Sequence, residues 1–504
     1  MIAEKLMNNR HKTFLNLLIS FATQIVTIVL GLIVPRLVLV NYGSDVNGLV
    51  GTIGQVFTYI ALLEAGIGVA ARNKMFKPIK MDDKSEISYW CSIAQKYYRK
   101  ISFIYLLAVL LLSFALPFVL KSEVGYWTIF VYILFEGLSS VVTFFFANSW
   151  ICFLIASGKS YITNSISLLV KILMYAVKIV LTINGINIGI IQVGYFFISL
   201  VQTLIYYLYM KKKYSWIDFN CAPKNATLPD KNSYIVTEVA WTIFSSTDLI
   251  ILSIFVSTSL SSVYSVYSMV FAALNGLLNS IFHSLSYNLG QIYFSDIEKY
   301  KKIHSAYNSA FFGIMTVMMC VSYALIIPFV KLYTSGINDV NYIYEWAPLL
   351  FCLIQMLSWS RYVSGNLAGI AGYAKQTSYI SIMEAGINIV VSLILVNFFG
   401  LYGVLFATVV ALPIKVIWCN WLAEIKILKR NPAKTIIIFA TNWFIFIATV
   451  VVFSFVHLKI NSYFEFFIYG VALFVLYCVI TFLLNCIANR DLMRFKFFVP
   501  NKKN

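Results

Sequence analysis

The chain has 504 residues, of which 60% are hydrophobic, 17% aromatic and 12% charged. Apolar runs of about 20 residues recur from end to end, which excludes an ordinary soluble protein and indicates an integral membrane protein. The formal net charge of +18 does not call for a nucleic-acid partner, because the basic segments of a membrane protein face an anionic inner leaflet.

The first apolar run extends over residues 13–40, which is too long for the apolar core of a cleavable signal peptide. Further apolar runs follow along the chain, so the sequence predicts an all-α integral membrane protein with fourteen transmembrane helices. Several runs exceed the bilayer thickness, and we expect these helices to tilt or to extend into the cytoplasm. The predicted spans are 13–40, 46–71, 101–120, 127–156, 162–183, 186–210, 234–256, 260–294, 307–333, 346–371, 377–398, 401–424, 434–457 and 463–488.

The distribution of Lys and Arg orients these helices. With the N-terminus in the cytoplasm, the cytoplasmic tails and loops contain 30 of the 38 basic residues, the outer loops contain three and the spans contain five. The positive-inside rule therefore places both termini in the cytoplasm. The outer loops are then all short, and the two longest loops, 72–100 and 211–233, are cytoplasmic.

The first of these long loops has a helical pattern of its own. Trp90, Ile93, Ala94 and Tyr97 lie at helical spacing within it. The pattern fits a helix that lies along the membrane surface before the third span, and it fits a solvated helical linker equally well.

Six spans, a polar stretch and six more spans suggest an internal duplication whose two halves have the same orientation. The stretch 157–166 (SGKSYITNSI) opens the fifth span and the stretch 373–382 (YAKQTSYISI) opens the eleventh. Each of these spans is followed by a glycine-containing turn and another helix. We therefore expect an N-lobe at 1–212, a cytoplasmic linker at 213–233, a C-lobe at 234–425, and two additional spans with a cytoplasmic tail at 426–504.

Ionisable residues inside the spans are the first candidates for a functional site. Each costs about 2.5–3.5 kcal/mol at the centre of a lipid-facing helix, so we expect them to face the protein interior or a wet cavity. Lys171 and Lys178 are seven residues apart and share one face of the fifth span. The basic residues are Arg36, Lys171, Lys178, Arg361 and Lys415, and the acidic residues are Glu64, Glu136, Glu238, Asp248 and Glu384.

Polar residues that share a helix face form a second set of candidates. Glu238 and Asp248 share a face of the seventh span with Trp241 and Ser245. A stripe along the eighth span steps by four residues and turns slowly round the helix. Its members are Asn275, Asn279, His283, Tyr287 and Gln291.

Two interpretations of the buried polar residues remain open. In the first, they line a cavity that binds a substrate. In the second, they pair with each other or with the backbone and fasten helices together, and the cations near span ends extend toward the interface. The second interpretation is favoured for the Asn and Ser residues and for His283. The first is favoured for Arg361 and Lys178, the two deepest cations.

Glu64 stands in a segment with two glycines, Gly66 and Gly68, that permit close helix approach. We therefore expect this segment to pack inside the bundle, where Glu64 meets a basic residue or water. The sequence EAGI recurs at 384–387 in the eleventh span, which is not the duplication partner of the second span, so we attribute the recurrence to chance.

Several other sites are excluded by their motifs. The eight cysteines form no CxxC pair and no cluster with histidine, so neither a disulfide framework nor a metal site is predicted. The sequence SGKS at 157–160 lacks the first glycine of a phosphate loop, where Phe153 stands, and it follows a span rather than a strand. We expect no cofactor.

The stretch 35–75 resembles the opening of the O-antigen and polysaccharide flippases of the MOP superfamily. It contains an Arg at the end of the first span, a Tyr-Gly turn, and an apolar second span that ends in glycines and a basic exit; these are Arg36, Tyr42, Gly43, Gly66, Gly68 and Arg72. The stretch 248–270 resembles the opening of the second half of that family, although the usual glycine next to the tyrosine is absent and Val263-Tyr264 stands there. The likeness covers the layout of about residues 13–425.

The resemblance implies a transporter, not an enzyme. It implies that an undecaprenyl-pyrophosphate-linked oligosaccharide is carried across the bacterial inner membrane by alternating access, for O-antigen, capsule or exopolysaccharide synthesis. On this hypothesis Arg361, Lys178, Lys171 and Arg36 attract the pyrophosphate, with Lys415 as a further cation, and the stripe 275–291 meets sugar or water. The implied partners are the lipid-linked oligosaccharide, membrane lipids and the polysaccharide polymerisation and export machinery. Coupling to H⁺ or Na⁺ is left open.

Three alternatives remain. A cation-coupled multidrug exporter of the same superfamily needs an acidic cavity, which Glu238 and Asp248 could supply. A peptidoglycan-precursor flippase also has fourteen spans. A polytopic glycosyltransferase or polymerase needs a sizeable outer loop for its catalytic residues, and the short outer loops argue against it.

Overall fold

The computed structural model describes the backbone at residues 2–62, 64, 67–219, 221, 242, 247–456 and 458–494. Within these ranges, side chains are described except at 2–18, 20–22, 24, 67, 69–70, 73, 80, 280–291, 294–295 and 374–375. Glu238 therefore lies outside the described residues. The side chains of His283, Tyr287 and Gln291 also lie outside the description, although their backbone does not.

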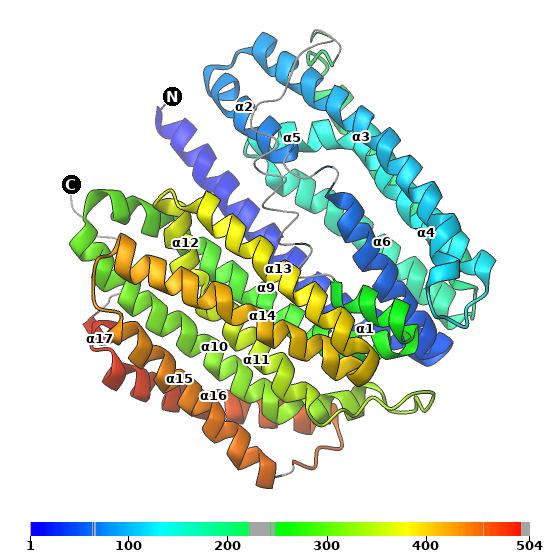
Figure 1. The fold of residues 1–504 in the computed structure, drawn as a ribbon. Coiled ribbons are helices and arrows are strands. Elements are labelled where there is room, and N and C mark those ends of the chain that lie inside the picture. Colours follow the sequence, from blue (N-terminus) through cyan, green and yellow to red (C-terminus); the bar gives the residue numbers. More distant parts are fainter. Residues whose placement is uncertain are drawn as a thin grey trace. The chain divides into compact units, whose positions relative to one another are not determined.

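The regular secondary structure of the described residues is all helical, without strands, in the order that Figure 1 shows. The elements are α1 (Ile2–Ala61), α2 (Ile67–Met81), α3 (Lys84–Val119), α4 (Tyr126–Val142), the π-helix η1 (Thr143–Ala147), α5 (Asn148–Ala156), α6 (Ser160–Ile183), α7 (Ile188–Lys213), α9 (Thr258–Ser295), α10 (Ile297–Tyr333), α11 (Ala347–Ser360), α12 (Tyr362–Ile370), α13 (Ala374–Phe399), α14 (Leu401–Trp421), the π-helix η2 (Leu422–Ile427), α15 (Ala433–Phe455), α16 (Tyr463–Ala488) and α17 (Asp491–Arg494). A further helical segment occupies 247–255.

Eleven helices in the described residues are long and apolar enough to cross a membrane, which makes this a multi-pass membrane protein. Three predicted spans are not among them, each for a definite reason. The span predicted at 46–71 lies in α1 only as far as Ala61, where that helix ends, and it shares α1 with the first span across the bend at Gly43. Most of the span predicted at 234–256 lies outside the described residues. The span predicted at 346–371 is interrupted at Arg361. A total of fourteen therefore stays a prediction.

Glycine permits the bend in α1 and a close approach beyond it. Gly43 has φ 82° and ψ 179°, a conformation that residues with a Cβ adopt only under strain. Five residues later, a Cβ on Gly48 would overlap the backbone carbonyl of Thr258 at the start of α9. The side chains of Asn47 and Ser262 hydrogen-bond beside this contact at 2.8 Å. The second part of α1 therefore packs backbone to backbone against the first turn of α9.

The turns before α6 and α13 have the same backbone geometry. Gly158 has φ 69° and Gly372 has φ 85°, the left-handed conformation that commonly ends a helix. In both turns the amide after the glycine donates to the carbonyl five residues earlier, and the glycine amide donates to the carbonyl three residues earlier. These are the two places that the sequence pairs as repeats.

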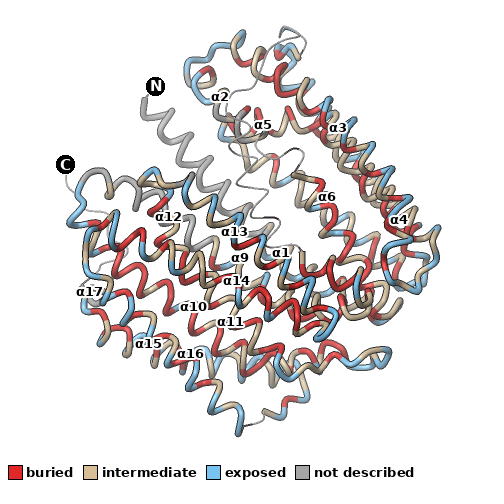
Figure 2. Tube along the Cα trace, in the orientation of Figure 1, coloured by how far each residue is buried: buried red, intermediate tan, exposed pale blue. Residues whose placement is uncertain are grey.

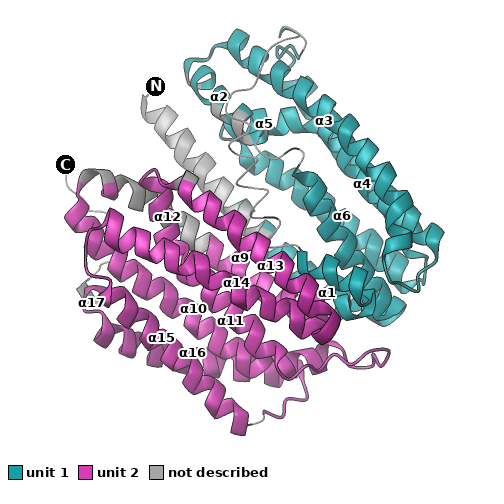
Figure 3. Cartoon of the chain, viewed as in Figure 1, with its two compact units in different colours: residues 1–262 teal, residues 263–504 magenta. Residues whose placement is uncertain are grey.

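The chain divides into two compact units, residues 1–262 and residues 263–504, shown in separate colours in Figure 3. The first unit is built on α1 to α7, with α4 packed between α3 and α7 and with α6 against α1. The second unit is built round α10, which is buried along most of its length (Figure 2). Helices α11, α15 and α16 all pack on α10, so the two helices beyond residue 426 belong to this unit.

The helical pattern predicted in loop 72–100 is the first part of α3. This helix begins at Lys84, where Asp83 caps it by accepting from the amide of Glu86, and it continues unbroken to Val119. Ile93 and Ala94 are fully buried in an apolar core with residues of α2, α5 and α7. The apolar face that we considered for the membrane surface therefore packs against protein.

Candidate functional site

The deepest cation of the second unit sits at a break in a helix. α11 ends at Ser360 and α12 begins at Tyr362, so Arg361 is the residue that joins them. Its carbonyl oxygen accepts a hydrogen bond from the amide of Gly365 at 2.7 Å, which starts α12. Discontinuous helices are common at the substrate sites of membrane transporters. The position of Arg361 at this break therefore makes it a candidate substrate contact.

The guanidinium of Arg361 donates from Nη1 to Oε1 of Glu384 on α13. The ammonium of Lys415 on α14 lies 3.7 Å from the other carboxylate oxygen of the same residue. The side chains of Arg361 and Glu384 are 4% and 2% exposed, whereas that of Lys415 is 16% exposed. Two cations from different helices thus converge on one buried carboxylate.

Aromatic and amide groups surround the helix break. The rings of Trp359 and Tyr362, on either side of Arg361, stack with their centroids 3.9 Å apart. The Trp359 indole donates to Oδ1 of Asn275 on α9 at 2.7 Å, which brings one member of the predicted polar stripe to this place. On the other side, Ser364 donates to Oδ1 of Asn420 on α14 at 2.7 Å.

The first unit contains its own buried cation. Lys178 on α6 is buried, its ammonium lies 5.7 Å from the centroid of the Tyr195 ring, and it interacts electrostatically with Glu136 on α4. The carboxylate of Glu136 also accepts a hydrogen bond from the side-chain amide of Gln192 on α7. Two helices, α4 and α7, therefore supply the groups round Lys178.

The other predicted residues of the first unit have separate surroundings. Lys171 lies about two helical turns before Lys178 on α6. It donates from Nζ to the hydroxyl of Thr27 on α1 at 3.1 Å. Glu64 accepts from Nδ2 of Asn148, the first residue of α5, at 2.9 Å. Arg36 is half-buried on α1, and Asp248 is buried in the segment 247–255. Lys171 and Lys178 share a helix face but not a partner.

The structure thus brings together part of the predicted set. Arg361 and Lys415 meet at Glu384, and Asn275 meets the neighbouring Trp359. Asn279 is half-buried on α9 and no contact of its side chain bears on the cluster. Sequence reasoning counted Glu384 and Glu136 among the acids of the spans but did not assign either to a site. The EAGI sequence that we attributed to chance contains Glu384, the carboxylate at the centre of the cluster.

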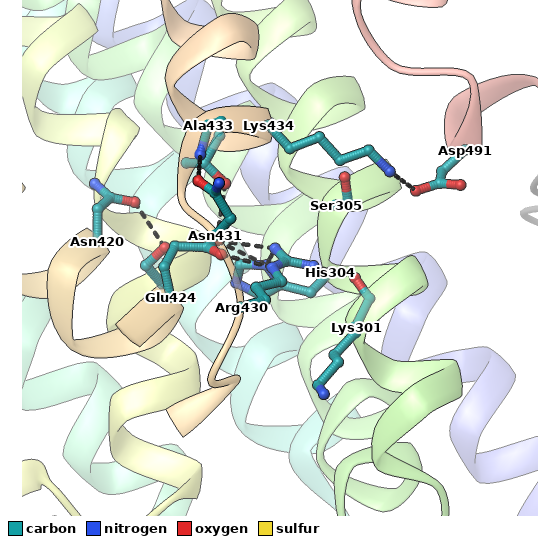
Figure 4. Close-up of polar contacts among 12 residues, drawn as sticks. Lys301, His304, Ser305, Asn420, Glu424, Arg430, Asn431, Ala433, Lys434 and Asp491 are labelled. Atoms are coloured by element: carbon teal, nitrogen blue, oxygen red, sulfur yellow. Dashed lines mark hydrogen bonds and ion pairs between the residues drawn. The ribbon is translucent and has the colours of Figure 1, made fainter. Parts of the chain in front are cut away.

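A second buried ionic cluster was missed entirely (Figure 4). Arg430 donates to both carboxylate oxygens of Glu424 at 2.5 and 2.8 Å and to the carbonyl of Lys301 at 2.5 Å. Its Nη2 lies 3.0 Å from Nδ1 of the fully buried His304, and Thr435 donates to Glu424 at 2.8 Å. Glu424 is the last residue of a predicted span, and Arg430 lies in the predicted cytoplasmic loop that follows it. The sequence therefore gives no sign that the two side chains form a buried ion pair.

This second cluster belongs to the packing of the C-terminal helices. It joins α10, η2 and the start of α15, and nearby Lys434 contacts Asp491 of α17 at 2.7 Å (Figure 4). Along α10, Ser309 donates to Asn485 of α16 at 3.0 Å. Arg430 donates to both carboxylate oxygens of Glu424 and to the Lys301 carbonyl, and one cation here meets one carboxylate, so we assign this cluster to structure.

The sequence matches no family model and no curated protein. Solved structures do match the fold. The lipid II flippase MurJ, in an inward closed conformation, has a TM-score of 0.66 at 15% identity and covers 95% of this chain and 100% of its own. An inward-facing multidrug resistance MATE family transporter of the MOP superfamily has a TM-score of 0.62 at 14% identity, covering 78% and 94%.

The chain has the fold of the MOP superfamily transporters. A further member with this fold is a transporter from Pyrococcus furiosus whose binding pocket is described as having reverse polarity, which suggested a different function for it. Its TM-score is 0.56 at 14% identity, with 81% of this chain and 96% of the other covered. Membrane transporters of differing cargo therefore share this architecture, and the cargo has to be argued from the residues.

Chemically, the Arg361 cluster suits an anion. Arg offers a planar fork of donors that matches phosphate oxygens, and Lys adds a compact charge. The two side chains carry more positive charge than the single carboxylate of Glu384 offsets. The stacked rings of Trp359 and Tyr362 and the amides of Asn275 and Asn420 add the aromatic and hydrogen-bonding groups that a sugar needs.

Proposed function

We propose that the protein is a flippase that moves an undecaprenyl-pyrophosphate-linked oligosaccharide from the inner to the outer leaflet of the bacterial inner membrane. The observation that carries this proposal is the convergence of Arg361, at the break between α11 and α12, and of Lys415 on the buried carboxylate of Glu384. A pyrophosphate group needs such cations, whereas a cationic drug needs uncompensated carboxylates. The repeat units would supply O-antigen, capsule or exopolysaccharide synthesis and pass to the polymerisation and export machinery.

Taken by itself, the first unit also contains cations that suit a diphosphate. Lys171 and Lys178 lie on one face of α6, and Lys171 is held by no more than a hydroxyl among the contacts described, at 3.1 Å from Thr27. Lys178 is balanced by Glu136, so in our proposal Lys171 and Arg36 attract the diphosphate and Lys178 orders the helices round it. The inside-negative membrane potential would favour outward movement of the anion by about 2.3 kcal/mol per charge per 100 mV.

The proposed mechanism is alternating access between two similarly oriented lobes. The matching turns at Gly158 and Gly372 support an internal duplication, with an N-lobe at 1–212, a linker at 213–233 and a C-lobe at 234–425. The remaining residues, 426–504, add two spans and a tail, which gives fourteen spans with both termini in the cytoplasm. Parallel repeats of this kind move as rigid bodies about a site near the bilayer midplane.

The test is deletion of the gene in its host, followed by measurement of lipid-linked glycan in the inner leaflet. We expect undecaprenyl-pyrophosphate oligosaccharide to accumulate and surface polysaccharide to disappear. Two other outcomes would replace the proposal. Sensitivity to cationic drugs with unchanged surface polysaccharide would indicate a multidrug exporter. Accumulation of the peptidoglycan precursor with arrested growth would indicate a lipid II flippase.

Complementation then assigns the site. Neutralising Arg361 alone would leave Glu384 buried and unpaired, so loss of function could follow from misfolding. The double variant Arg361→Met with Glu384→Gln removes both members of this ion pair, keeps most of the arginine volume and leaves Lys415 as the remaining cation. We expect it to reach the membrane at normal abundance and to restore little surface polysaccharide. Full restoration would remove Arg361 from the substrate site.

A further inference from the structure

The geometry points to a role for Glu384 that the flippase hypothesis does not by itself include. We propose that Glu384 is an internal anion that occupies Lys415 and Arg361 until a phosphate group of the substrate displaces it, and that its return expels the phosphate. The inference rests on the proposed function for the identity of the cargo. It concerns how the cargo is released rather than what the cargo is.

The position of Glu384 fits a competitor rather than a structural anchor for Lys415. The distance of 3.7 Å from Lys415 Nζ to Oε2 exceeds the range of a normal N–H···O hydrogen bond, about 2.7–3.2 Å. By contrast, Arg430 approaches Glu424 at 2.5 and 2.8 Å through two donors. Lys415 is thus held mainly by charge, and a second anion can replace Glu384 without breaking a short hydrogen bond at that side.

Exposure indicates the order of exchange. The Lys415 side chain is 16% exposed, while those of Arg361 and Glu384 are 4% and 2% exposed. An arriving phosphate therefore meets Lys415 first and the Arg361 fork second. Arg361 joins α11 and α12, and its carbonyl keeps the bond to the Gly365 amide, so in our proposal its side chain alone changes partner.

The exchange would allow a tightly bound anion to be released. A site with two buried cations and no internal anion would bind a diphosphate so tightly that release would be slow. A carboxylate fixed on the neighbouring helix α13 weakens binding and speeds release in proportion. Glu384 would thereby set the residence time of any phosphate group at the site.

The test uses purified full-length protein in detergent and inorganic pyrophosphate as the probe. We expect Glu384→Gln to lower the Kd for pyrophosphate by about ten- to hundredfold, because the loss of a competing charged hydrogen bond is worth that much. In cells the same variant should export polysaccharide more slowly than the wild type. Adding Lys415→Gln to Glu384→Gln should abolish most of the gain in affinity.

Glu424→Gln is the matched control. It raises the net charge by the same amount and removes a buried glutamate of the same unit, but Arg430 keeps its bonds to the Lys301 carbonyl and to His304. Its Kd should stay within about twofold of the wild type. Two results overturn the exchange. One is an equal gain in pyrophosphate affinity in both variants. The other is an unchanged affinity in Glu384→Gln protein that unfolds at the same temperature as the wild type.

A further variant covers the case in which Glu384→Gln does not fold. Glu384→Asp keeps the charge but shortens the side chain, so it should reach the two cations less well and give a smaller gain in affinity. An unchanged Kd in this variant also overturns the inference. Failure of the flippase proposal is recognised separately, because gene deletion would then leave surface polysaccharide intact whatever the pyrophosphate affinities are.

Discussion

The cluster of Glu424, Arg430 and His304 predicts a large and specific loss of stability when one ionic partner is removed. Glu424 is 1% exposed and receives two hydrogen bonds from Arg430 and one from Thr435. Arg430→Met removes the two charged bonds and leaves a carboxylate buried with a single hydroxyl donor. Breaking a buried pair in this way costs about 3–5 kcal/mol.

The assay is equilibrium unfolding of purified protein in mixed micelles, with membrane abundance as a second measurement. The double variant Arg430→Met with Glu424→Gln should recover most of the loss, because no unpaired charge is then buried. Lys434→Ala is the control: its contact with Asp491 is a surface pair, with side chains 49% and 21% exposed, and should contribute no more than about 1 kcal/mol.

Either of two results would contradict the predicted cost of leaving the Glu424 carboxylate unpaired. One is a loss of less than about 1 kcal/mol for Arg430→Met, which would mean that water or another group replaces the guanidinium. The other is a double variant as unstable as the single one, which would place the cost in lost packing of the Arg430 side chain rather than in the stranded charge.

Two further predictions concern the first unit. Gly48→Ala would push a methyl group into the Thr258 carbonyl and should lower stability by at least about 1–3 kcal/mol, whereas Gly54→Ala, with open space at its Cβ, should be neutral or slightly stabilising; thermal unfolding of both variants checks this, and equal melting temperatures would contradict the close approach. In a double-mutant cycle, Lys178→Met and Glu136→Gln should each destabilise more than their combination does, with a coupling energy of about 0.5–3 kcal/mol; strictly additive effects would show that the two charges do not interact.

Much of the fold could be predicted from the sequence, because long apolar runs have few alternatives in a bilayer. The helices α4 to α7 and α13 to α16 lie close to the predicted spans, and α3 ends close to its predicted end but begins 17 residues earlier, at Lys84. The interruption at Arg361 was not predicted. The single proline of the run 346–371 is Pro348, in the first turn of α11, and an arginine in an apolar run does not by itself indicate whether the helix continues past it.

The candidate site was predicted only by residue type. The cost of burying charge identifies Arg361, Lys415 and Lys178 as residues that need partners, and the structure supplies one for each. Which acid meets which base depends on how helices far apart in sequence pack together. Spacing along a single helix carries no such information, so Glu384 and Glu136 could be counted as acids but not placed at a site.

The attachment of the last helices to α10 has a consequence for any attempt to shorten the protein. Cutting the chain after residue 427 would delete Arg430 and Thr435, the donors that satisfy Glu424, and would remove Asn485 from Ser309. The remaining fragment would expose a polar seam on α10 directly to acyl chains. We expect the truncated protein to be degraded. The terminal helices are therefore needed for the second unit to fold.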